Sequence, residues 1–94
     1  MDQKIKSLWI KALRSGKYKQ AHSVLRDNND AMCCLGVLGL IQGVPPEELK
    51  GKLSYDIPRG LNGGLRKTSR RVLGKMNDAG KTFHDIAAYI AKHY

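Results

Sequence analysis

The chain is short of acidic residues, of cysteine and of any long hydrophobic run. Asp and Glu total 8 against 17 Lys and Arg in 94 residues, which gives a formal net charge of +9. This imbalance favours polyanionic partners and says little about the fold. The few acids also provide no acid/base carboxylate pair, and Asp56 and Asp85 are best explained as turn and cap residues. A glycine-rich phosphate loop and a serine triad are likewise missing.

The absence of long hydrophobic runs bears on location. No stretch approaches the roughly 20 apolar residues of a membrane span, and the amino-terminal segment has no uninterrupted signal-peptide core. Glycines break the longest apolar run, at 31–41. We therefore expect a cytoplasmic protein without membrane contact. A hydrophobic content of 41% suffices for one folded domain over residues 1–94.

The two cysteines are adjacent, which excludes several kinds of site. A disulfide between Cys33 and Cys34 would strain the backbone, and a reducing compartment disfavours it. Zinc sites need spaced ligand pairs, whereas the three histidines are scattered along the chain. We therefore predict no metal and no cofactor.

A nucleophilic cysteine remains an alternative. Asp30 is expected to cap a helix beginning at Ala31, and a thiol in a first helical turn has a lowered pKa. His22 would then be the base. Cysteine is also a small residue that is often buried, and the residues after Cys34 are apolar. We favour packing as the role of both cysteines.

Glycine spacing and helical periodicity predict the fold. Gly36, Gly39 and Gly43 lie at i, i+3 and i+7, so they give one helix a smooth face that another segment can approach closely. We predict a mainly α fold, with four to five short helices around this central glycine-rich helix. The apolar pattern places the others at 5–13, after Pro45, at 65–76 and after Thr82, where T-x-x-D has capping-box spacing. Gly16 is expected to end the first of these helices. The residues expected on the buried faces are Ile5, Leu8, Trp9, Ala12 and Leu13 in the first helix, and Leu65, Ser69, Val72, Leu73 and Met76 in the helix at 65–76.

The segment 17–27 is left open between strand and helix. If it is extended, residues 52–57 are the candidate partner in a short two-stranded β element. Residues 27–30 form a turn by composition. The glycine- and proline-rich segment 54–64 is a candidate functional loop.

Two patterns carry a family resemblance. One is W-x-x-A-L-x-S-G from Trp9 followed by C-C-L-G-V-L from Cys33, and the other is N-D-x-G-x-x-F-x-x-I-A from Asn77. Together they resemble small uncharacterised proteins of bacteriophages and prophages, over the first 43 and the last 18 or so residues. Those proteins often carry an aromatic residue and a further cysteine where this chain has Met32 and Gly39, which lowers the prospects of thiol or metal chemistry. The resemblance implies an accessory factor that acts by binding, and it brings no catalytic residue.

The carboxyl-terminal pattern also resembles the start of a helix-turn-helix. If DNA is bound, we expect the preceding helix, at 65–76, to be the element that reaches a groove. This helix carries the densest basic cluster, including the like-charged i, i+4 pairs Arg66/Arg70 and Lys67/Arg71. Such pairs weaken an isolated helix, and a bound anion would offset that cost.

The candidate anion-binding residues are therefore Arg66, Lys67, Arg70, Arg71 and Lys75, joined by Lys17, Lys19, Arg26 and Arg59 if the fold brings them together. Arginine binds phosphate through a two-point fork, and lysine adds a point charge. Tyr18 and Tyr55 are candidates for stacking on a base.

Three functions follow from these features. The leading hypothesis is a non-enzymatic phage-type protein for host takeover or anti-defence, whose basic surface binds nucleic acid, a nucleotide signal or a host nucleic-acid machine. The first alternative is a protein–protein inhibitor of a host enzyme, steered by charge and anchored near residues 54–61. The second is a small cysteine-dependent enzyme. The oligomeric state, including a dimer, stays open.

Overall fold

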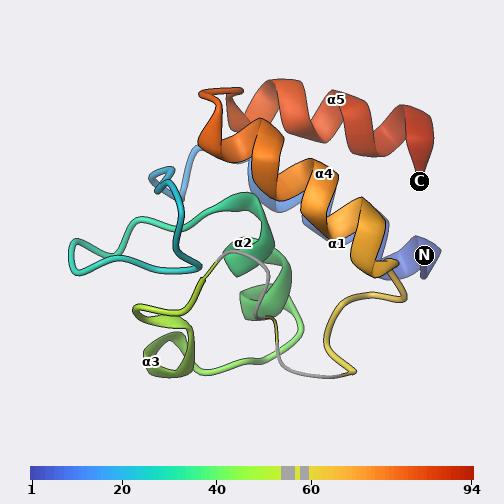
Figure 1. Cartoon of the computed structure of the whole chain (residues 1–94). Helices are drawn as coiled ribbons and strands as arrows, with labels where there is room; N and C mark the ends of the chain where they lie inside the picture. Colours follow the sequence, from blue (N-terminus) through green and yellow to red (C-terminus); the bar gives the residue numbers. More distant parts are fainter. Residues whose placement is uncertain (54–56, 58–59) are drawn as a thin grey trace.

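The computed structural model describes residues 1–53, 57 and 60–94, and its regular structure is helical (Figure 1). The described residues form five helices: α1 (Gln3–Arg14), α2 (Cys34–Ile41), α3 (Pro46–Leu49), α4 (Lys67–Asp78) and α5 (Phe83–His93). The mainly α prediction is confirmed. In this part of the chain, β-type pairing is limited to isolated bridges.

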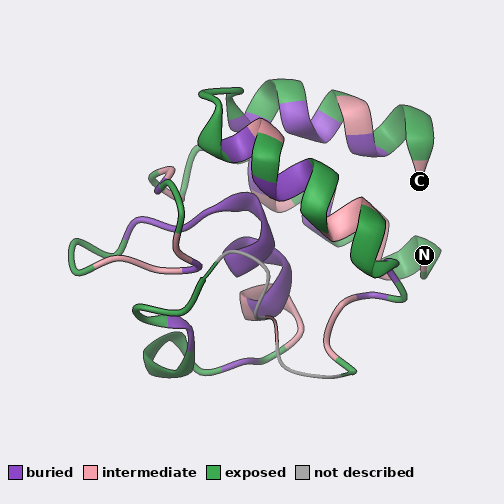
Figure 2. Cartoon of the chain, viewed as in Figure 1, coloured by how far each residue is buried: buried purple, intermediate pink, exposed green. Residues whose placement is uncertain are grey.

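Helix α2 forms the centre of the hydrophobic core, as predicted from its glycines. Its residues from Cys34 to Gly39 are all buried (Figure 2). Helices α1 and α4 each pack against both α2 and α5. Gly36 permits the closest approach, because a Cβ atom there would lie 2.0 Å from the carbonyl oxygen of Leu25. Gly43 lies beyond the end of α2 with a φ of +94°, so its predicted place on the helix face is wrong.

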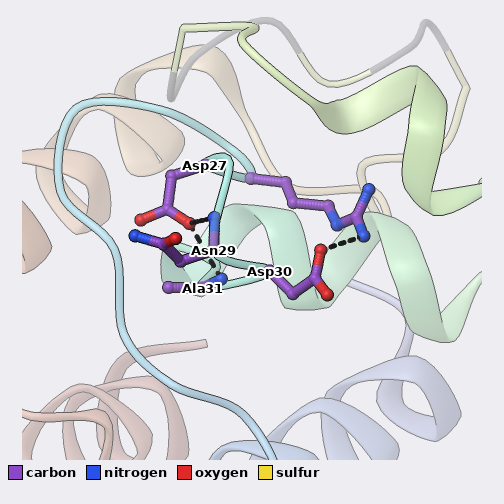
Figure 3. Close-up of polar contacts among 5 residues, drawn as sticks. Asp27, Asn29, Asp30 and Ala31 are labelled. Carbon is purple, nitrogen blue, oxygen red and sulfur yellow. Dashed lines mark hydrogen bonds and ion pairs between the residues drawn. The ribbon is translucent and has the colours of Figure 1, made fainter.

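The start of α2 also differs from the prediction. Asp30 has a φ of +64° and does not cap the helix. The N-cap is Cys33, whose Sγ accepts a hydrogen bond from the Gly36 N–H at 3.4 Å. The predicted turn at 27–30 is present, and Asp27 Oδ1 accepts the backbone N–H groups of Asn29 and Ala31 at 2.8 and 3.0 Å (Figure 3). The left-handed residue at the end of this turn delays the helix to Cys34.

The segment 17–27, open between strand and helix, forms neither. Among the described residues of the predicted partner segment, Leu53 forms an antiparallel bridge with Val24, beside a 2.8 Å hydrogen bond from the Leu25 N–H to the Lys52 carbonyl. Ser23 interrupts the segment with a φ of +68°. In the described residues, isolated bridges are present where the sequence left a short two-stranded element open.

The amino-terminal helix follows its predicted pattern with one exception. In α1, Trp9 and Leu13 are buried, and the helix ends before Gly16, whose φ of +76° lets the chain turn away. Leu8 was expected on the buried stripe but is 47% exposed.

The carboxyl-terminal helices α4 and α5 form a hairpin. Helix α4 begins at Lys67 and ends at Asp78, two residues later at each end than predicted. At the start of α5, the Asp85 N–H donates to Thr82 Oγ1 and the Thr82 N–H donates to Asp85 Oδ2. The predicted capping box is therefore confirmed in both directions.

Candidate anion-binding surface

Several residues of the two sequence patterns form a buried hydrogen-bond network. Trp9 Nε1 donates to the Cys34 carbonyl at 2.9 Å, and the Cys34 N–H donates to Asn77 Oδ1 at 3.1 Å. The same oxygen accepts Gln20 Nε2 at 2.9 Å, while Asn77 Nδ2 donates to the Ala21 carbonyl at 2.7 Å. Asn77 is fully buried and connects α4 to α2 and to the 20–21 segment. These pattern residues stabilise the fold, and the exposed side chains are the ones that can contact a binding partner.

The cysteines lie in this buried region. Both side chains are 0% exposed, and the Cys34 Sγ–H donates to the Leu73 carbonyl oxygen at 3.7 Å. Burial raises the pKa of the Cys34 thiol well above its ordinary value, and the neighbouring Cys33 adds to the effect. His22, the candidate base, is exposed. Burial therefore disfavours the thiolate form of Cys34, and the position of both cysteines in the core supports their interpretation as packing residues.

We expect the thiols of the native protein to react slowly with iodoacetamide at pH 8. Because the reactive species is the thiolate and both sulfurs are buried, labelling should be limited by opening of the fold. Mass spectrometry over time would follow the modification, with the urea-unfolded protein at the same pH as the rapidly labelled control. Native labelling as fast as the control would restore the cysteine-enzyme hypothesis.

The acidic side chains are largely used within the fold. Among the described residues, Asp2, Asp27 and Asp85 accept backbone hydrogen bonds at helix starts or in a turn. Asp78, the last residue of α4, accepts one from the Ser23 N–H. Over the described ranges, the single ion pair joins Arg26 to Asp30 (Figure 3). Most of the positive charge is therefore not balanced by ion pairs in this part of the chain.

Helix α4 carries the clearest row of exposed cations. Lys67, Arg71 and Lys75 lie at i, i+4 and i+8, and all three are exposed. Residues four apart lie one above the other on a helix, so these three form a row about 12 Å long. We call them the α4 stripe. The one acid in α4, Asp78, accepts the Ser23 N–H at 2.7 Å.

The two other predicted α4 residues have different surroundings. Arg70 is half-buried, and its Nη1 donates to the Leu65 carbonyl at 2.7 Å, so part of its guanidinium group is used within the fold. Arg66 is exposed at the N-cap position of α4. It lines a cavity of about 260 Å³ together with Ser69 and Tyr94. Sequence periodicity did not separate these two residues from the stripe.

The other predicted anion-binding residues lie on separate elements. Lys17 and the half-buried Tyr18 line a groove beside α1, and Lys19 is exposed in the segment that follows. Arg26 lies at the turn, bound to Asp30. The predicted residues Tyr55 and Arg59 fall outside the described part of the chain.

A second basic region, which the sequence analysis missed, lies between α4 and α5. An open groove of about 470 Å³ has among its lining residues Met76, Lys81, Asp85, Tyr89, Lys92 and His93. The rings of Tyr89 and His93 lie 4.2 Å apart between centroids, tilted by 32°. The i, i+4 spacing of Tyr89 and His93, next to Lys92, is the sequence signal that could have identified this region.

Neither a metal-binding cluster nor a membrane-spanning helix is present among the described residues. In the ranges that the structure describes, no group of three or more His, Cys, Asp or Glu side chains could hold a metal ion. None of the described helices has the length and apolar character needed to cross a membrane.

The amino-terminal part of the chain matches a protein-family model. Residues 1–44 match the model of a domain of unknown function, DUF8296. No curated protein and no solved structure matches the chain. The matched region contains α1 and α2, whereas the α4 stripe and the α4/α5 groove lie outside it.

Proposed function

We propose that this chain is a non-enzymatic accessory protein of the bacteriophage type, which acts in the host cytoplasm by binding a polyanion, with nucleic acid as the leading target. One observation carries the proposal. Three exposed cations follow one another along α4, while the neighbouring acid, Asp78, is held by a backbone N–H. A row of like charges weakens a helix, and phosphate groups would offset this repulsion.

The stripe predicts a defined salt dependence. Each cation that contacts a phosphate releases a counterion, so log K falls with log salt with a slope of about −0.7 to −0.9 per contact. Three contacts from Lys67, Arg71 and Lys75 correspond to a slope of about −2 to −3. Steeper values would require further cations, such as Arg66 at the start of α4.

We expect the triple variant Lys67→Ala/Arg71→Ala/Lys75→Ala to bind a labelled oligonucleotide at least tenfold more weakly at low salt. Its salt slope should become shallower by about 2 to 3, because phosphate contacts are lost roughly one per side chain. Fluorescence anisotropy at 50 to 200 mM salt measures both quantities. Arg70 is left intact because it binds the Leu65 carbonyl.

The matched control is Lys4→Ala/Lys11→Ala/Arg14→Ala on α1. It removes two lysines and one arginine from exposed helical positions, so the net charge falls by the same amount. The control should keep most of the affinity. Equal losses in the two triple variants would reduce the effect to overall charge and contradict a site on α4.

One observation favours the alternative of a host-enzyme inhibitor. An open groove of about 570 Å³ lies along α1, lined by Ile10, Lys11 and Arg14, and Leu8 nearby is 47% exposed. A protein partner held there would leave the α4 triple variant unaffected. Binding of that protein partner would be lost in the α1 triple variant, although its binding of the oligonucleotide is retained. The same variant therefore tests both hypotheses. The predicted anchor at 54–61 lies mostly outside the described residues.

A further inference from the structure

The groove between α4 and α5 combines cationic and aromatic side chains. Lys81 and Lys92 line it, and so do the rings of Tyr89 and His93. The one acid among the lining residues, Asp85, has its Oδ2 bound to the Thr82 N–H in the capping box. The groove therefore offers point charges for phosphates and π surfaces for bases.

The two rings form a stacking platform. Tyr89 is half-buried and packs against the core, whereas His93, one helical turn further, is exposed. Their centroid separation of 4.2 Å means that His93 rests on a ring that the core holds in place. Base stacking on such rings tolerates any sequence, because every base has a π face.

The groove is also adjacent to the α4 stripe. Lys75 ends the stripe, and the next residue, Met76, lines the groove. The Lys81 N–H donates to the Met76 carbonyl at 3.0 Å, so the connection after α4 holds Lys81 beside the same point. A strand whose backbone follows the stripe to Lys75 would therefore meet the groove and Lys81 at the end of α4.

We propose that the α4/α5 groove binds single-stranded nucleic acid, with bases stacked on the Tyr89–His93 pair and the backbone held by the flanking lysines. This inference rests on the proposed function and deepens it. A duplex keeps its bases paired inside the helix, so it can use the stripe but not the aromatic pair. Single strands combine phosphate contacts with stacking, which is the usual arrangement in proteins that bind them without sequence preference.

The test compares three labelled probes of equal length by anisotropy at one salt concentration. They are an oligo(dT) strand, an abasic strand with the same phosphates, and a duplex. The wild-type protein should bind oligo(dT) about tenfold more tightly than the abasic strand, because one stacked base contributes about that factor. The duplex should bind more weakly than oligo(dT).

Variants at His93 isolate the stacking. His93→Ala should bind oligo(dT) about tenfold more weakly, leave the abasic strand unaffected and keep the wild-type salt slope. His93→Phe keeps an aromatic ring, so it should restore the affinity. Because His93 is exposed, both variants should fold. Tyr89→Leu removes the other ring and keeps an apolar side chain, so it provides a second test of stacking by the affinity for oligo(dT).

The outcomes separate this inference from the proposed function. Equal affinity for the three probes, with no effect of His93→Ala or Tyr89→Leu, overturns the groove inference, while loss in the α4 triple variant still supports the stripe. If none of the probes binds the wild-type protein, the proposed function fails and the inference fails with it.

Discussion

Replacing Gly36 with alanine is expected to destabilise the protein by about 3 kcal/mol or more, at the upper end of the range for overpacked cores. The added Cβ would lie 2.0 Å from the carbonyl oxygen of Leu25 and 2.9 Å from its carbonyl carbon. The backbone of Leu25 cannot easily move, because it is hydrogen-bonded on both sides. The Leu25 carbonyl accepts the Cys33 N–H, and the Leu25 N–H donates to the Lys52 carbonyl. Steric exclusion therefore outweighs the gain of about 1 kcal/mol that alanine normally brings to a helix.

Gly39 offers a control in the same helix. A Cβ there would meet Leu49 Cδ2 at 3.4 Å and Val44 Cγ2 at 3.6 Å, which are side-chain atoms at ordinary contact distance. Gly39→Ala should be neutral or stabilise the fold by up to about 1 kcal/mol. Urea unfolding followed by circular dichroism at 222 nm measures both variants. If Gly36→Ala were as neutral as Gly39→Ala, the segment around Leu25 would not lie tightly against α2.

The helices that could be predicted from the sequence are those with local signals. In α5, Thr82 and Asp85 cap the first turn, and the apolar stripe beginning at Phe83 then faces the core. In α1, the same periodicity identified Trp9 and Leu13, and Gly16 marked the end. Caps and stripes involve residues within a few positions of one another, so a single sequence contains them.

The segment before α2 could not be predicted, because its conformation depends on distant contacts. Asp30 is a residue type that is common at N-cap positions, yet its left-handed backbone ends a turn that Asp27 stabilises. The real cap, Cys33, is held by the Leu25 carbonyl, and the next N–H is bound by Asn77, 43 residues further on. Tertiary hydrogen bonds decided the helix start against local preference.

The candidate site was predictable in part for a related reason. The basic cluster of α4 is evident in the sequence, but which side of the helix faces the core depends on how α2 and α5 pack against it. That packing half-buries Arg70 and leaves Lys67 and Arg71 exposed. To predict the α4/α5 groove, one would need the angle between the two helices, and sequence periodicity does not give that angle. Val72 of α4 was expected on the buried face of the helix but is 41% exposed.

Removing the Asn77 side chain should have an effect at least as large as that of Gly36→Ala. Asn77→Ala leaves the buried Cys34 N–H and the Ala21 carbonyl without their hydrogen-bond partner. Each unsatisfied buried group costs about 1 to 3 kcal/mol, so we expect a loss of about 3 to 4 kcal/mol. Asn28 is exposed in the turn, and Asn28→Ala should change the free energy of unfolding by less than about 0.5 kcal/mol.

A double-mutant cycle with Gln20 would show whether Asn77 acts through the network. Gln20 Nε2 donates to Asn77 Oδ1 at 2.9 Å and to the Lys81 carbonyl at 2.7 Å, so Gln20→Ala alone should cost about 1 kcal/mol. In the Asn77→Ala background its cost should fall, with a coupling of at least about 0.5 kcal/mol, because the shared hydrogen bond is already gone. Additive losses, measured by urea unfolding, would mean that the Gln20–Asn77 hydrogen bond contributes nothing and that Asn77 stabilises the fold through its bonds to Cys34 and Ala21. Coupled losses would establish that the buried Asn77 amide joins helix α4 to the amino-terminal half of the chain through Gln20.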